Sequence, residues 1–186
     1  MNHIGTMELS TERLLLRKIR IEDDRDMFEQ WASDPQVTKY LTWGAHRSIE
    51  DTRQIIALWL KDQDEPHVYR WVIELKSIGK VIGTIDLVSV DTRHRCGVFG
   101  YCLSAQYWNQ GIASEALKVM LTYLFVEAGF HRIEASHLIE NPASGKVMLK
   151  CGMKLEGNKR KKFLGHDGEF HDLLVYGLLE EEFLID

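Results

Sequence analysis

The feature that most constrains this chain is a predicted strand–turn–helix junction in residues 100–115, GYCLSAQYWNQGIASE. An apolar strand over 100–103 runs into a tight segment that holds Asn109, Gln110 and Gly111, and a long helix is predicted to begin near Ala113. The first turn of a helix carries backbone N–H groups without intrahelical partners, and the helix dipole adds partial positive charge there. Such a junction favours an anion, most often phosphate.

A glycine at position 111 lets the backbone of this junction approach a ligand closely. We therefore expect a pyrophosphate to bind the backbone of Gln110, Gly111, Ile112, Ala113 and Ser114. The alternative is an ordinary strand–helix turn that contains one glycine, and a single glycine does not decide between the two.

A second motif follows in the stretch IENPASGKVMLKCGM, which ends at Met153. Asn141 followed by Pro142 predicts a helix start, with asparagine at the N-cap and proline at the first helical position. Gly152 predicts the end of this helix as a C-terminal cap. The predicted order is therefore strand, Gly111 junction, long helix, strand and capped short helix.

Taken together, the two motifs resemble the GNAT superfamily of acyl-CoA-dependent N-acetyltransferases. Within it, the sequence is similar to the branch of ribosomal-protein alpha-amino acetyltransferases and their uncharacterised relatives. The likeness extends from about Thr11 to Glu180. The residues that carry it are Gly100, Tyr101, Trp108, Gly111, Ile112, Ala113, Glu115, Ala116, Asn141, Ser144, Lys150, Gly152 and Met153.

Hydrophobic patterning predicts the remaining elements. The expected strands are 13–19, 69–75, 81–90, 96–103, 132–139, 153–157 and 170–179, and the expected helices are 22–31, one that starts at Ser48, 113–128 and 142–151. The resemblance implies an α/β (α+β) fold in one domain, with a central mixed, mostly antiparallel sheet of about seven strands flanked by about four helices. The same resemblance implies that this sheet is splayed between the fourth and fifth strands. We expect a loose N-terminus over 1–10, the acetyltransferase domain over 11–180 and a C-terminal tail over 181–186.

Composition narrows the function classes. With 186 residues, 45% of them apolar and 27% charged, the chain has the make-up of one globular domain. Its net charge of −5 argues against a nucleic-acid partner, and no apolar run is long enough to span a membrane. The three cysteines lack metal-ligand spacing and no signal peptide is visible, so we expect no metal and a reducing cytoplasm. The oligomeric state stays open, with a homodimer as one option.

The resemblance implies an N-acetyltransferase that moves the acetyl group of acetyl-CoA to a primary amine by direct attack on the thioester. The acceptor would be a protein N-terminal α-amine or a small-molecule amine. The pantetheine of CoA is expected to bond the strand backbone near Leu103, where an amide would donate to the thioester oxygen. Ser144 matches a family position beside the sulfur, and we take Asn141 and Ser144 as candidates for catalysis and CoA binding. The alternative is that both residues only cap a helix.

Two positions depart from the family pattern. Met148 stands where many members carry a tyrosine as general acid, and Val98 stands where a glutamate is often found. No general base can therefore be carried over. These departures keep a second function open, an acyl-CoA-binding module or sensor with little catalytic activity. A P-loop nucleotide-binding protein is not supported, because the string GxxxxGK[S/T] does not occur.

Three further features each have two interpretations. Tyr40 and Trp43, in a predicted loop over 37–44, either anchor that loop over the core or line the acceptor pocket. Asp86 lies in an apolar strand and is either an outward-facing residue, which we favour, or a carboxylate base that faces the cleft. The cations at 159–162 form either a solvated strand end, which we favour, or a contact for the 3′-phosphate of CoA or an acidic acceptor.

Overall fold

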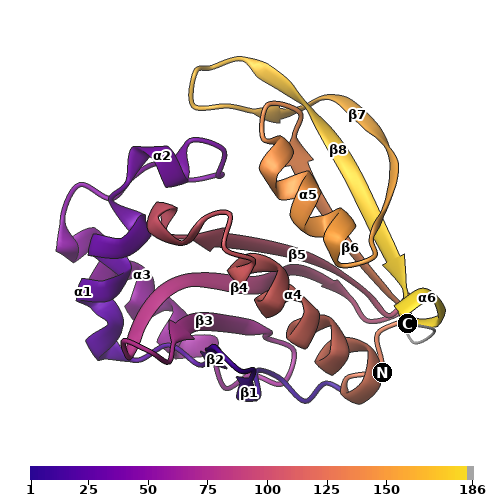
Figure 1. Ribbon diagram of the computed structural model, residues 1–186, viewed down its shortest axis with the longest axis horizontal. Helices are drawn as coiled ribbons and strands as arrows, with labels where there is room; N and C mark the ends of the chain where they lie inside the picture. The colour runs from indigo at the N-terminus through magenta and orange to yellow at the C-terminus, as the bar shows by residue number, and fades with distance from the viewer. Residues whose placement is uncertain (184–186) are drawn as a thin grey trace.

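The computed structural model describes residues 1–183, and within them eight strands form one sheet (Figure 1). The strand order is β1-β2-β3-β4-β5-β6-β8-β7, and neighbouring strands are antiparallel except β5 and β6, which are parallel. The predicted mixed, mostly antiparallel sheet is confirmed, with one additional short strand, β1. The strands are β1 (Leu9–Ser10), β2 (Leu14–Arg17), β3 (Arg70–Leu75), β4 (Lys80–Asp91), β5 (Cys96–Leu103), β6 (Arg132–Leu138), β7 (Lys154–Leu164) and β8 (Phe170–Leu179).

The same residues form six α-helices, two more than expected because α2 and α6 are single short turns. The helices are α1 (Asp24–Met27), α2 (Pro35–Thr38), α3 (Ile49–Asp62), α4 (Ile112–Thr122), α5 (Pro142–Lys150) and α6 (Glu180–Phe183). Both α1 and α4 continue into a π-helical turn, over Phe28–Ala32 and Tyr123–Glu127 respectively. These combined segments correspond to the helices predicted over 22–31 and 113–128.

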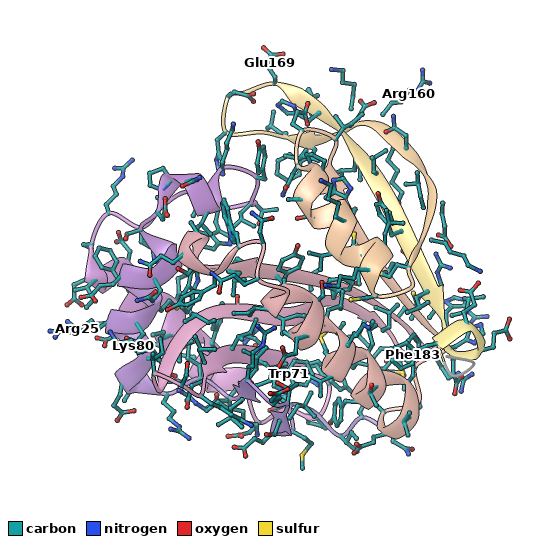
Figure 2. The ribbon with its side chains drawn as sticks, viewed as in Figure 1. Arg25, Trp71, Lys80, Arg160, Glu169 and Phe183 are labelled. Atoms are coloured by element: carbon teal, nitrogen blue, oxygen red, sulfur yellow. The ribbon has the colours of Figure 1, made fainter. Side chains whose placement is uncertain are left out.

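Alternation of side chains along the strands builds a separate hydrophobic core on each face of the sheet. On the α4–α5 face, Leu117 and Leu121 pack in one buried cluster with Trp71, which Figure 2 labels inside the molecule. On the α1–α3 face, Trp31 and Ile56 pack in a second cluster. Because neighbouring strand residues face opposite cores, the position of a residue along its strand decides which face it serves.

Residues 1–10, expected to be loose, are held against the sheet and α4. The Asn2 amide donates to Ala128 (2.8 Å), and the Tyr123 hydroxyl donates to the carbonyl of Gly5 (2.6 Å). Thr6 is buried and bonds β3 through its side chain. These partners are distant in sequence, which explains why local patterning could not predict them. Of the expected tail over 181–186, residues 181–183 lie in α6 and the rest lies outside the described residues.

Several helices begin or end at the capping residues that the sequence predicted. Ser48 caps α3, and reciprocal bonds join it to Asp51 in a capping box. Gly152 follows α5 with a φ of 85°, and the Met153 amide bonds back to Met148 in the pattern of a Schellman cap. The predicted loop over 37–44 is partly helical, because Asp34 accepts from the Gln36 amide and starts α2.

The strand predicted over 153–157 extends through the cationic run to Leu164 as β7. Its side chains are exposed almost throughout, and Figure 2 shows Arg160 projecting outward from this edge strand. Asp172 of β8 holds an irregularity in the strand by accepting from the Lys161 amide (2.9 Å) and from Asn158 (2.8 Å). The run is therefore part of a solvated strand, as favoured from the sequence.

Candidate active site

The sheet opens between β5 and β6. These strands pair over three residues only, and the last pair joins Val98 to Glu134. Beyond that pair the described strands diverge, as Figure 1 shows, so the predicted splay is confirmed. The backbone amide of Ser104 donates to the carbonyl of Ile82 in β4 (2.8 Å). Along an antiparallel strand, the backbone N–H groups of successive residues point alternately to the two neighbouring strands. The backbone amides of Tyr101 and Leu103 therefore point into this β5–β6 opening.

Leu103, predicted to meet the pantetheine, is buried at the end of β5. Its carbonyl accepts a hydrogen bond from the Trp108 indole (2.8 Å), which fixes the turn that follows the strand. The end of β5 is thus anchored at Leu103. Between Val98 and Leu103, the edge of β5 that faces the opening has no strand partner within residues 1–183.

The Gly111 junction has the backbone that an anion site requires. Asn109 and Gly111 both adopt left-handed conformations, with φ of 59° and 77°, and α4 begins directly afterwards at Ile112. No side chain among the described residues caps this helix, so the first-turn amides of Ile112, Ala113 and Ser114 are free to bind a ligand. The helix starts one residue earlier than predicted, and the predicted set of backbone donors stays together.

Positive charge surrounds this junction. A Cβ atom built on Gly111 would lie 3.7 Å from Arg13 Nη2 and 3.8 Å from Lys150 Nζ. Lys118 and Lys150 also line a surface hollow beside α4. The sequence did not identify Arg13 or Lys118 as site residues, because neither belongs to a local motif and only folding brings them to the junction.

A partly exposed ion pair joins the junction to the residues just before β2. The Glu115 carboxylate accepts from the Thr11 hydroxyl (2.5 Å) and from Arg13 Nε (2.7 Å), while Arg13 Nη1 donates to the Gln110 carbonyl (3.1 Å). Burial alone would raise the pKa of Glu115, but the hydrogen bonds from Thr11 and Arg13 outweigh it and lower the pKa below its usual value. Glu115 is therefore ionised at neutral pH, and it holds the loop in place.

Asn141 and Ser144 lie together at the start of α5, where the sequence predicted them. Pro142 occupies the first turn, but the Asn141 side chain makes no capping bond in the described structure. It donates instead through Nδ2 to Ser144 Oγ (3.0 Å). The interpretation of the Asn141 side chain as a cap is therefore wrong, and its amide serves to orient the serine.

Tyr101 completes this group from β5. Its hydroxyl donates to Ser144 Oγ (3.3 Å) and thereby bridges the β5–β6 opening to α5. Burial raises the pKa of the Tyr101 phenol above its ordinary value, so it remains a proton donor at neutral pH. The sequence noted the Gly100–Tyr101 pair but gave the tyrosine no role. Strand alternation, which turns Tyr101 to the α4–α5 face and Cys102 to the other, could have indicated it.

The seating of α5 depends on a glycine. A Cβ atom on Gly145 would lie 2.5 Å from His137 Nε2 and 2.9 Å from the Tyr176 hydroxyl, both buried beneath the helix. Met148, which replaces the tyrosine of many relatives, is buried in the same core. On the α4–α5 face, the phenol hydroxyl therefore comes from Tyr101 of β5, and α5 contributes the hydroxyl of Ser144.

Of the two aromatic candidates, Trp43 lies on the α1–α3 face, and Tyr40 precedes it in the same loop. Trp43 is half-buried, packs against the core cluster of that face and lies 5.3 Å from the His46 ring. Tyr40 is also half-buried, with the Lys39 ammonium 5.0 Å from its ring centre. Neither ring has a hydrogen bond or a ring contact to Asn141 or Ser144 among the described residues.

Asp86 is not the outward-facing residue that we favoured. It is half-buried in β4, opposite Arg70 of β3 and Gly100 of β5. Burial raises the pKa of Asp86 to about 6, although the charge of Arg70 acts in the opposite direction. Val98, in contrast, offers no polar group at the position where relatives often carry a glutamate.

Two further features concern residues 1–183. No helix there is both long and apolar enough to cross a membrane. The same residues contain no cluster of three or more His, Cys, Asp or Glu side chains with the arrangement of a metal site.

Comparison with known proteins gives the family. The acetyltransferase (GNAT) domain family matches residues 13–154. An uncharacterized N-acetyltransferase of Bacillus subtilis (strain 168), YoaA, is 31% identical over 172 residues, which cover 92% of this chain and 96% of that protein. The crystal structure of a GNAT-family acetyltransferase from Bacillus anthracis superposes with a TM-score of 0.83 at 33% identity, covering 95% of this chain and all of that one.

Two structures of lower identity share the fold. A ribosomal-protein-S5-alanine acetyltransferase from Vibrio fischeri has a TM-score of 0.83 at 20% identity, covering 95% of this chain and 98% of that one. The microcin C7 self-immunity acetyltransferase MccE, solved with acetyl-CoA and AMP, has a TM-score of 0.82 at 20% identity, covering 91% of this chain and 93% of that one. The long match to the family and the relatives of 31% and 33% identity lead to one conclusion: this chain belongs to the GNAT family of acetyltransferases.

Proposed function

We propose that this protein transfers the acetyl group of acetyl-CoA to a primary amine at the β5–β6 opening. The observation that carries the proposal is the position of Ser144 and Tyr101 across that opening, on the same face of the sheet as the free amides of the Gly111 junction. This arrangement supports the binding of acetyl-CoA with its phosphates at the Gly111 junction and with a proton donor near the thioester sulfur.

The phosphate end of CoA is best served by the Gly111 junction. Free amides at Ile112, Ala113 and Ser114 donate to one pyrophosphate, and the helix dipole adds to their effect. Lys150 and Arg13 supply formal positive charge close to the same backbone. A backbone cradle with cations at its edge is favourable for a doubly charged ligand because hydrogen bonds to ionised acceptors are among the strong ones.

The hydrogen bonds around Ser144 leave its own proton available. Its oxygen accepts from the Tyr101 hydroxyl and from Asn141 Nδ2, so both lone pairs are occupied. The Ser144 O–H is then directed to a third partner, for which we propose the sulfur of CoA. As the amine nitrogen bonds the carbonyl carbon and the C–S bond breaks, the departing thiolate accepts this hydrogen bond or proton.

The thioester oxygen needs a donor on the opposite side of the carbonyl. The amides of Tyr101 and Leu103 point into the opening, and we propose that one of them stabilises the oxyanion that forms. A fixed amide is suited to this role because it is already oriented and needs no rearrangement when charge develops.

The acceptor class is proposed as a primary amine, either the N-terminal α-amine of a protein or a small-molecule amine. The fold shared with the ribosomal-protein acetyltransferase supports testing α-amines first. Tyr40 and Trp43, in the loop that follows α2, are proposed to line the acceptor's entry, because aromatic surface binds the apolar part of an amine and a ring face attracts its charge. The three free cysteines are compatible with a reducing cytoplasm, which we propose as the setting.

The direct test is release of free CoA thiol. The protein is incubated with acetyl-CoA and a panel of N-terminal peptides and small amines, and thiol release is followed together with acetylated product by mass spectrometry. We expect release that depends on both protein and amine. Tight acetyl-CoA binding without amine-dependent release across the panel would instead favour the acyl-CoA-binding module.

A further inference from the structure

Asp86 faces the side of the sheet opposite to Ser144. Its neighbours in β4, Ile85 and Leu87, both pack in the core of the α4–α5 face, so alternation directs Asp86 to the α1–α3 face. Thr84, two residues before it, confirms this direction because its hydroxyl lies 3.1 Å from the thiol of Cys102, which packs on the α1–α3 face.

The Asp86 carboxylate has no hydrogen-bond or ion-pair partner within residues 1–183. Its cross-strand neighbour Arg70 is engaged elsewhere: Nη1 pairs with Asp62 of α3 (2.9 Å), and the guanidinium lies 5.1 Å from the ring centre of Trp59. On the β5 side the titratable neighbour is Cys102, and burial raises the pKa of this thiol to about 11, so it is neutral. Asp86 is therefore a half-buried acid whose surroundings leave it free to receive a cation.

Gly100 places this acid beside the β5–β6 opening. It lies opposite Asp86 and is two residues beyond Val98, which makes the last contact with β6. A Cβ atom on Gly100 would lie 3.9 Å from Asp86 Oδ1 and 3.3 Å from Val88 Cγ1. Because glycine has no side chain, residue 100 itself does not separate the carboxylate from the open edge of β5.

Proton-handling groups thus lie on the two sides of one opening. Tyr101 and Ser144 occupy the α4–α5 face, and Asp86 occupies the other face one strand away. We propose that Asp86 binds the ammonium form of the acceptor on the α1–α3 face and takes its proton before attack. This inference rests on the proposed acetyl transfer and assigns the general base that the sequence left open.

Transfer from R–NH3⁺ to the Asp86 carboxylate gives R–NH2 and a neutral Asp86, whose proton is later released to solvent. The nitrogen lone pair attacks the carbonyl carbon, the C–S bond breaks, and its electron pair leaves with sulfur. The second nitrogen proton is lost as the amide forms, and the thiolate gains one proton through Ser144, so the products are the acetamide, CoA thiol and one H⁺.

An unpaired acid at this position also lowers the stability of the fold. Burial disfavours the ionised form, which must exist at neutral pH without a hydrogen-bonding partner in the described chain. Perturbed acids of this kind cluster at functional sites, where activity outweighs the loss of stability. Asp86→Asn should therefore melt at the same temperature as the wild type or higher at pH 7.5.

The test uses Asp86→Asn, with Asp91→Asn as matched control, since Asp91 is an exposed acid at the end of the same strand. With the best peptide acceptor from the amine panel, Asp86→Asn should lower kcat/KM for the amine by about 100-fold or more, as expected for loss of a general base. Acetyl-CoA affinity and melting temperature should not fall, and Asp91→Asn should behave like the wild type.

The pH profile separates a base from a structural residue. In the wild type, kcat/KM for the peptide should rise through a pH near 6, where Asp86 becomes ionised. In Asp86→Asn that rise should move to the pKa of the free peptide α-amine, about 8, because only the neutral amine can then attack. An unchanged rate or profile, or a loss explained by weaker acetyl-CoA binding or a lower melting temperature, would overturn the assignment.

A second measurement does not depend on turnover. Carbon-13 NMR can follow the Asp86 carboxyl in the CoA complex, with and without excess trialanine as the amine probe. An ammonium beside Asp86 should lower its apparent pKa, whereas an unchanged titration would contradict the proposal. If the wild type acetylates no amine, the proposed function fails, but this titration still decides whether Asp86 faces the amine.

Discussion

The two faces of the β5–β6 opening are built differently. On the α4–α5 face the polar groups are joined to one another: Ser144 accepts from Tyr101 and Asn141, and Glu115 accepts from Thr11 and Arg13. On the α1–α3 face, Asp86 has no partner among the described residues, and Trp43 of the loop after α2 packs against the apolar core. One face is fixed before any ligand binds, and the other leaves its polar group unpaired.

This difference corresponds to what each face would have to bind. CoA is the same in every turnover, so a rigid set of donors is an advantage on the α4–α5 face, where preoriented dipoles lower the barrier most. Acceptors differ in shape, and a single unpaired acid on the α1–α3 face would select for charge and leave the selection for shape to other residues of that face. We call the α4–α5 face the rigid face and the α1–α3 face the adaptable face.

The largest effect is expected for Gly145→Ala, which disturbs the rigid face directly. The new Cβ would lie 2.5 Å from His137 Nε2, and His137 cannot move easily because it is buried and bonded to Leu138 and Tyr176. Helix α5 must then shift and carry Ser144 away from Tyr101. We expect turnover to fall by about 100-fold or more, since a misplacement of about 1 Å has that effect.

The free energy of unfolding of Gly145→Ala provides a second test that does not depend on turnover. Alanine in place of glycine in a helix normally stabilises by about 0.5–1 kcal/mol. Here overpacking should instead destabilise by about 1–3 kcal/mol, as measured by urea unfolding. Lys146→Ala, an exposed change on the same helix, is the control and should keep both activity and stability. A fully active and more stable Gly145→Ala protein would show that α5 does not need this close contact.

Local signals predicted the rigid face well. The N-terminus of α4 at Gly111, the start of α5 at Pro142 and its end at Gly152 all follow from residues adjacent in sequence, where glycine and proline act on their own backbone. The reciprocal Ser48–Asp51 bonds of α3 were predictable for the same reason. These motifs also carried the resemblance to the family.

The adaptable face was poorly predicted because its residues meet only through strand pairing. The environment of Asp86 depends on Arg70 and Gly100, which lie on two other strands, and the sequence alone favoured an exposed position. The ordered N-terminus and the position of Arg13 beside Gly111 are likewise products of long-range contacts. The pattern of residues along one strand predicts which face of the sheet a side chain occupies. Its neighbours on adjacent strands can be predicted only when the register of the strand pairing is known.

The next effect in size concerns CoA binding through the Gly111 junction. Gly111→Val places a side chain where the pyrophosphate should approach, and the loss of one or two hydrogen bonds of about 1.5–3 kcal/mol each should weaken CoA by at least tenfold. Calorimetric titration with CoA measures this.

Gly79→Val is the matched control for the Gly111 variant. Both glycines have positive φ, 61° and 77°, and a Cβ on Gly79 would meet no described atom within 4 Å. Both variants carry similar backbone strain of about 1–2 kcal/mol, but only the Gly111 change should affect the ligand. Equal CoA affinities in two folded variants would remove the junction from the binding site.

A more selective effect, confined to turnover, is expected for Ser144→Ala. If the serine donates to the departing thiolate, turnover should fall by about 100-fold while acetyl-CoA affinity stays near the wild-type value. A residue that only caps α5 would instead affect stability, by about 1 kcal/mol. Turnover and melting temperature measured on one preparation distinguish these outcomes, and a purely thermal effect would refute the catalytic role.

The smallest effect, and the one that tests the adaptable face, is expected for Trp43→Ala. If Trp43 lines the acceptor's entry, the KM for the amine should rise by about tenfold, the scale of losing one aromatic contact, while the KM for acetyl-CoA is unchanged. A packing role predicts a different result: a loss of up to about 3–5 kcal/mol of stability, with both substrates affected together. Ile55→Ala is the control, because Ile55 is half-buried against the same core from α3 and lies outside the aromatic loop. If Ile55→Ala and Trp43→Ala change stability alike and neither changes the amine KM, the loop serves only to cover the core, and specificity must arise from other residues around Asp86.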